Sequence, residues 1–277
     1  MPVTLRGSGP VGVIFAGMTE AVQPSEGWGV LHLFYTVDRQ AGGEAGAAKR
    51  ILDAVAAFEA DGHQVLLSCV LGHKADLGVM ALGPDLARIQ AFEAELAGVS
   101  ALRPVYSYLS LTELSEYRST EDEERARLSS HTEGLTPEAV EQRIEAWKTR
   151  MAKYTEDKLH PQLPRKKLIC FYPMSKRRSG DANWYTLSFE DRRRLMGGHA
   201  RVGMGYAGRV LQLVTGSFAF DDWEWGVTLL ADDPVALKEI LYEMRFDEVS
   251  ALYGEFGPFL VGLLYEPAEA LARLGVS

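Results

Sequence analysis

The order of strand-like and helix-like segments in this chain occurs twice. A β-α-β-β-α-β order runs from Trp28 to Leu111, and the same order returns from Lys167 to Leu264. Short stretches also match between the copies: Asp76-Leu77-Gly78-Val79 corresponds to Glu224-Trp225-Gly226-Val227, and Gly83-Pro84 corresponds to Asp233-Pro234. This order is ferredoxin-like, and two fused halves of this kind can pack sheet against sheet. We therefore expect an α+β barrel made of two ferredoxin-like halves.

Local patterns predict where the individual elements begin and end. Pro84 is expected to be the first residue of a helix, where its missing N–H needs no partner. Pro234 is expected to open a helix in the same way, and Ser188 with Asp191 forms a capping-box-like helix start. The expected strands are 28–37, 64–71, 76–82, 102–111, 167–173, 209–218, 223–231 and 258–264, with a helix over 44–60 and a candidate extra strand over 11–16.

A change in composition separates the two halves. We expect an N-terminal ferredoxin-like half (residues 1–115), a helical connector (116–163) and a C-terminal ferredoxin-like half (164–277). The connector begins with densely charged sequence. Apolar residues then recur at steps of three and four, which predicts a helix that packs one face on something. These residues are Val140, Ile144, Trp147, Met151 and Tyr154.

Composition excludes several classes of function. The net charge of −9 argues against nucleic acid as the main partner, because a phosphate-binding face needs an excess of Lys and Arg. No basic segment followed by an apolar core opens the sequence, and no apolar run approaches the roughly 20 residues that span a bilayer. Cys69 and Cys170 lie in strand-like runs, which predicts buried free thiols. We therefore expect a cytoplasmic protein without a transmembrane segment.

The second half carries several motifs that belong together. They are the run from Leu168 to Arg178, Asn183-Trp184-Tyr185, a helix with His199, Gln212, Asp221 to Gly226, and Met244 to Ser250. This stretch resembles the chlorite dismutase-like haem proteins, and within them the coproheme decarboxylases most closely. The resemblance covers nearly all of the second half, whereas the first half matches in layout only. The helix over 44–60 has no histidine, so we expect one haem site per chain, in the second half.

The resemblance implies a role for four residues. His199 would be the proximal haem ligand, and one histidine is enough because a porphyrin supplies four ligands of the iron. Without the resemblance, a lone histidine on a helix is more often structural. Tyr172 would lie beside a propionate and become a radical, and Lys176 would contact a propionate. Gln212 would occupy the distal position, where true chlorite dismutases have an arginine, which argues against chlorite as the substrate.

Other positions are weaker candidates by resemblance. Met174 is either a core residue or part of the pocket, and Arg245 and Ser250 would help to hold a propionate. A propionate-binding arginine of the family falls at Lys158, with Arg165 as a possible substitute. A ligating imidazole usually donates its other N–H to a carboxylate or carbonyl. The candidate partners of His199 are Glu243 and Glu248, and the sequence does not choose between them.

The resemblance implies a peroxide-dependent coproheme decarboxylase. Iron coproporphyrin III (coproheme), held by His199, would be both substrate and cofactor, and hydrogen peroxide would be the oxidant. Tyr172 would relay the oxidation to two propionates, which become the vinyl groups of haem b. The family members form rings, often pentamers. The alternatives are a non-catalytic haem carrier or sensor, and a chlorite dismutase or haem peroxidase on the same fold.

Overall fold

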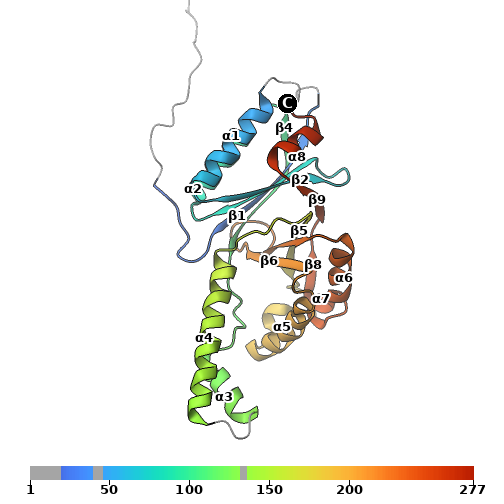
Figure 1. Cartoon of the computed structure of the whole chain (residues 1–277). Coiled ribbons are helices and arrows are strands. Elements are labelled where there is room, and N and C mark those ends of the chain that lie inside the picture. The colour runs from blue at the N-terminus through green and yellow to red at the C-terminus, as the bar shows by residue number, and fades with distance from the viewer. Residues whose placement is uncertain (1–19, 40–45, 132–135) are drawn as a thin grey trace, which may run out of the picture.

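The structure is a computed structural model that describes residues 20–39, 46–131 and 136–277 (Figure 1). The expected strand over 11–16 lies outside the described residues. No helix in the described part has the length and apolar character needed to cross a membrane. The elements in chain order are β1 (Gly29–Val37), α1 (Ala47–Ala60), β2 (Gln64–Val70), β3 (Leu77–Gly83), α2 (Leu86–Ala97), β4 (Leu102–Thr112), α3 (Glu121–His131), α4 (Pro137–Leu159), β5 (Leu168–Lys176), a 3-10 turn (Trp184–Thr186), α5 (Phe189–Met204), β6 (Val210–Gly216), β7 (Trp225–Ala231), α6 (Pro234–Met244), α7 (Glu248–Tyr253), β8 (Gly254–Phe256), β9 (Leu260–Tyr265) and α8 (Pro267–Leu274).

The strands close into a barrel of two halves. The first half has the strand order β4-β1-β3-β2 and the second has β6-β7-β5-β9, which is the same order under the internal repeat. The halves join through β4 with β6 and through β2 with β9, and every pairing is antiparallel. The short β8 extends the sheet by pairing with the end of β5. The predicted α+β barrel is confirmed.

Alternation along the strands divides the apolar residues between the barrel interior and its outer faces. The interior combines both halves: Val30 and Met80 pack with Ile169 and Leu230, and further clusters continue this packing. Outside, α1 and α2 cover the first-half strands. The second-half strands are covered by α5 and α6, which lie at the opposite end of the molecule from α1 (Figure 1).

Helix starts follow the capping rules, with one difference from expectation. Ser188 caps α5 as predicted, and its hydroxyl accepts the backbone N–H of residue 191. Pro234 is the first residue of α6, behind the cap Asp233. Pro84, in contrast, does not open α2. The side chain of Asp85 caps that helix, which places Pro84 one residue before the cap. The aspartate accepts a helical N–H, a role that proline cannot take.

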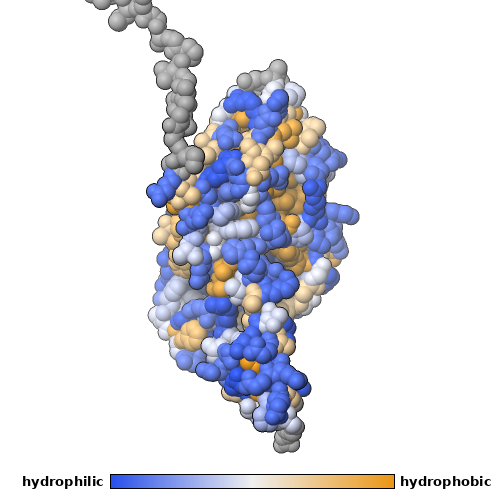
Figure 2. Space-filling model, turned by 60° about the vertical axis from the view of Figure 1, so that its left-hand side comes forward, coloured by the Kyte–Doolittle hydropathy of each residue, from blue (hydrophilic) through white to orange (hydrophobic). Residues whose placement is uncertain are grey.

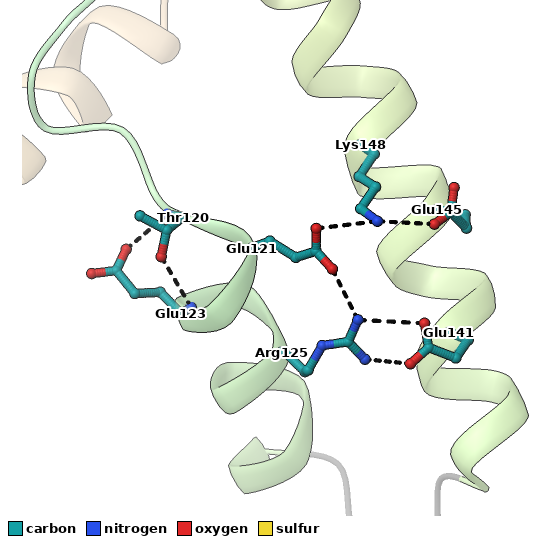
Figure 3. Close-up of polar contacts among 7 residues, drawn as sticks. All are labelled: Thr120, Glu121, Glu123, Arg125, Glu141, Glu145 and Lys148. Carbon is teal, nitrogen blue, oxygen red and sulfur yellow. Dashed lines mark hydrogen bonds and ion pairs between the residues drawn. The ribbon is translucent and has the colours of Figure 1, made fainter.

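The connector forms a helical hairpin, α3 and α4, that projects from the barrel (Figure 1). Its surface is mainly hydrophilic (Figure 2). Figure 3 shows the ion pairs between the helices: Glu121 contacts Arg125 of α3 and Lys148 of α4, and Arg125 also pairs with Glu141. The predicted apolar face of α4 packs only in part, because Ile144 is fully buried whereas the other members are half-buried or exposed.

The last helix, α8, packs against the first half although it follows the second-half strands in sequence. Ala270, Leu271 and Val276 are buried in the cluster beneath α1 and α2. Helix α8 contacts α1 and β2 directly. The chain therefore returns to the first half after completing the second.

Candidate functional site

Strand β5 carries three of the predicted site residues. It was expected to end at Pro173, but it continues to Lys176. Pro173 has no N–H to donate, but its carbonyl accepts a hydrogen bond from the backbone N–H of Gly257 at 2.9 Å, and β8 pairs with residues 174–176 beyond it. Alternation on the longer strand puts Tyr172, Met174 and Lys176 on one face. Tyr172 and Met174 pack there with the cluster under α5 and α6, so this is the outer face of the second half.

Tyr172 is buried in an aromatic environment. It is 4% exposed, and its ring stacks on Phe259 with 4.5 Å between the centroids. Burial and the neighbouring Cys170 raise the pKa of its phenol, whereas the charge of Arg245 lowers it. The guanidinium of Arg245 lies 3.8 Å from the centroid of the Phe256 ring, which is 6.0 Å from that of Tyr172. The phenol therefore keeps its proton at neutral pH, near a cation.

Lys176 is a buried cation. It is 7% exposed, and its Nζ atom lies 4.9 Å from the centroid of the Trp184 ring. Burial lowers the pKa of its ammonium to about 8, and the nearby carboxylates of Asp247 and Glu224 partly oppose this shift. No hydrogen bond from this ammonium to another described residue is found. A carboxylate of a bound molecule would be a suitable partner for this ammonium.

The imidazole of His199, on α5, is held by a carboxylate that the sequence analysis did not predict. Its Nδ1 atom lies 3.0 Å from Oδ2 of Asp247. Asp247 caps α7 and accepts hydrogen bonds from the backbone of Val249 and Ser250 and from the hydroxyl of Ser250. Burial opposes ionisation of Asp247, but the hydrogen bonds from His199 and Ser250 outweigh it and hold the pKa of its carboxyl below the usual value.

The two expected partners of His199 point elsewhere. Glu243 accepts a hydrogen bond from the hydroxyl of Tyr206 at 2.7 Å. Glu248 pairs with Arg194 at 3.6 Å. The expectation of Glu243 or Glu248 is therefore wrong. The Asp-x-x-Ser pattern from Asp247 predicts a helix cap, but it does not indicate that this carboxylate also contacts His199.

Gln212 and Lys158 are brought together beside α5. The Gln212 amide donates to the carbonyl of Gly203 at 3.0 Å, and a Cβ at Gly203 would lie only 3.2 Å from that amide nitrogen. Lys158, in the last turn of α4, donates to the backbone carbonyl of Gln212 at 3.4 Å, and burial lowers its pKa. Arg165 lies at the opposite end of β5, exposed and paired with Glu266. Lys158 is therefore near Gln212, whereas Arg165 is not.

The site therefore lies between the outer face of the second-half strands and helices α5 to α7. Among the residues that the structure describes, no group of three or more His, Cys, Asp or Glu could hold a metal ion. A metal bound by His199 would need most of its ligands from a bound molecule, as a porphyrin provides. With Nδ1 engaged by Asp247, Nε2 is the nitrogen left for ligation. The cations Lys176 and Arg245 suit the carboxylates that such a molecule would carry.

Comparison with known proteins gives consistent results. The family model described as chlorite dismutase matches residues 44–265. The chain is 38% identical to the coproheme decarboxylase of Staphylococcus carnosus (strain TM300) over 268 residues, covering 92% of this chain and 98% of that protein. A haem-binding protein of Thermus thermophilus is 36% identical, with a TM-score of 0.73 over 92% of this chain and all of that one.

A more distant solved structure shares the fold alone. The chlorite dismutase of Candidatus Nitrospira defluvii, in complex with imidazole, is 16% identical with a TM-score of 0.66, covering 91% of this chain and 97% of that one. The family model spans most of the sequence, from α1 to β9. The chain therefore belongs to the chlorite dismutase family.

Proposed function

We propose that this protein is a coproheme decarboxylase, which converts two propionates of iron coproporphyrin III to the vinyl groups of haem b with hydrogen peroxide. The observation that carries the proposal is the shared face of β5. A buried phenol, Tyr172, and a buried cation, Lys176, lie four residues apart on that face, next to the helix of His199. The relative of S. carnosus that carries the name coproheme decarboxylase supports the same activity.

The iron porphyrin, when bound, supplies the oxidising chemistry with peroxide. His199 would ligate the iron through Nε2. Asp247 would orient the ring and increase its basicity by accepting a hydrogen bond from Nδ1–H. This role for Asp247 rests on its four hydrogen bonds, which leave its carboxylate little freedom to turn.

Tyr172 would give up one electron and one proton together and then take a hydrogen from the β-carbon of a propionate. Its burial suits this role, because a phenol with a raised pKa keeps the proton that it must transfer. Carbon dioxide would then leave that propionate as a second electron passes to the peroxide-oxidised porphyrin, which forms the vinyl group, so each round would use the two oxidising equivalents of one peroxide. A second round converts the other propionate.

The cations would hold the propionates in reach of Tyr172. Arg245 lies near the phenol, Lys176 lies further along the same face of β5, and Lys158 approaches from α4 beside Gln212. Met174 and Gln212 would line the pocket. Ser250 would reach a propionate only by giving up its hydrogen bond to Asp247, so we assign it first to holding Asp247.

A second candidate is a non-catalytic haem carrier or sensor, which the name of the T. thermophilus relative as a haem-binding protein favours. Mixing the purified protein with coproheme and peroxide separates the two functions. A product mass lower by two carbon dioxides and their hydrogens supports the enzyme, whereas unchanged coproheme that stays bound supports the carrier. Oxygen release from chlorite at a rate comparable to that of decarboxylation would overturn both proposed functions. Gln212 in place of the distal arginine argues against such chlorite activity.

We further propose that the enzyme acts in the cytoplasm as a homopentamer, with one site per chain in the part from residue 164 to 277. The resemblance supports the ring, and the free thiols Cys69 and Cys170 suit a reducing compartment. Light scattering after size-exclusion chromatography measures the mass of the assembly. A mass of one or two chains would contradict the pentamer.

A further inference from the structure

The interior of the barrel contains a histidine in largely apolar surroundings. His32 lies on β1 and is 1% exposed. Its ring stacks on Phe171 of β5, with 4.0 Å between the centroids. Its Nε2 atom lies 2.9 Å from Oγ1 of Thr228 on β7. Phe171 and Thr228 are themselves paired across the two strands, so a first-half side chain contacts both members of a second-half strand pair.

The other ring nitrogen of His32 has no hydrogen-bond partner among the described residues. Within residues 20–39, 46–131 and 136–277, two buried side-chain polar atoms lack a hydrogen bond, namely Nδ1 of His32 and the hydroxyl of Tyr106. Buried polar atoms in native proteins are nearly always paired, with protein or with ordered water. Burial also lowers the pKa of His32 to about 3, so the ring is neutral and carries one donor and one acceptor.

A cavity adjoins this ring because the residues around it are small. Ser68 on β2 is paired with Gly78 on β3. Gly262 on β9 also abuts Ser68, because a Cβ there would lie 2.8 Å from the Ser68 side chain. These three residues line the cavity together with His32 and a set of apolar side chains. The free space is about that of one water molecule.

We propose that this cavity is the binding site of a single buried water molecule that hydrogen-bonds Nδ1 of His32. Water both donates and accepts, so it completes the pairing of the neutral ring whichever nitrogen carries the proton. The hydroxyl of Ser68, which also lines the cavity, offers a second partner. No Asp, Glu, Lys or Arg lines the cavity, so an ion is a poor occupant, and an apolar gas would leave the nitrogen unpaired.

A crystal structure of the full chain at about 1.5 Å resolution tests the site directly. We expect one discrete peak at about 2.7–3.2 Å from Nδ1 of His32. His32→Phe keeps a ring but removes the nitrogen, so the peak should disappear. Thr228→Val is the matched control, since it removes the partner of the other ring nitrogen and should leave the peak in place.

Featureless density beside Nδ1, or a direct bond from Nδ1 to a protein atom, would each overturn the proposal. The water site does not depend on the proposed function, so neither result bears on the other.

Discussion

The buried ammonium of Lys176 predicts how the affinity for coproheme depends on pH. Burial lowers the pKa of this lysine to about 8, so in the free protein the cation is present below pH 8 and is lost as the pH rises above it. If the ammonium binds a propionate, the protein must take up a proton to bind coproheme above pH 8. The dissociation constant should then rise about tenfold per pH unit, or roughly 30-fold at pH 9.5.

The measurement is a titration of the free protein with ferric coproheme at fixed ionic strength, followed by Soret absorption between pH 7 and 9.5. Lys176→Arg is the matched control, because a guanidinium stays charged throughout this range. Ionisation of the propionates and hydroxide binding to iron affect both proteins equally. The ratio of the two dissociation constants therefore isolates Lys176. Lys176→Met should bind more weakly at pH 7 and lack this pH dependence.

A constant ratio between wild type and Lys176→Arg from pH 7 to 9.5 would refute the reasoning. It would mean either that the ammonium titrates as an ordinary exposed lysine or that it does not contact the substrate. The two possibilities differ at pH 7. Only an ammonium that does not contact the substrate would leave the affinity of Lys176→Met equal to that of the wild type.

Four further substitutions test the proposed roles. His199→Ala should remove the iron–histidine Raman band, and a spectrum equal to wild type would contradict the ligand assignment. Tyr172→Phe should nearly abolish vinyl formation, while the free energy of coproheme binding weakens by at most about 3 kcal/mol. Both quantities are measured on one preparation. Near-normal formation of both vinyl groups would exclude Tyr172 as the relay. Asp247→Asn keeps a helix cap but loses the charge, so the iron–histidine stretching frequency should fall with little change in Tm. An unchanged frequency would mean that Asp247 acts only as a helix cap. Gln212→Arg is predicted not to create efficient chlorite turnover, which an oxygen electrode measures.

The barrel was predictable because its signals are local. Helix and strand periodicity acts over a few residues and recurs in the same order in both halves. The cap at Ser188 and the Pro at the start of α6 are equally local signals in the second half. Closure of the barrel is a long-range property. It followed from the repeat, since two halves with the same strand order present matching edges to each other.

The partner of His199 was not predictable from local patterns. Three acidic residues, Glu243, Asp247 and Glu248, lie within six positions of one another, and spacing alone does not distinguish them. The choice depends on how α7 packs against α5, a tertiary contact. The end of β5 was missed for a similar reason. Proline often ends a strand because it has no N–H to donate, but β5 continues past Pro173 because β8, far along the chain, pairs with residues 174–176.

The return of α8 to the first half has a consequence for synthesis of the chain. The pocket that Ala270, Leu271 and Val276 fill is formed by first-half residues, which are synthesised earlier. Until residues 260–276 have been synthesised, that apolar surface remains open, and β2 has no neighbour on the side that β9 later occupies. The first half therefore cannot bury this surface by itself, and the barrel closes only after the second-half strands and α8 have left the ribosome.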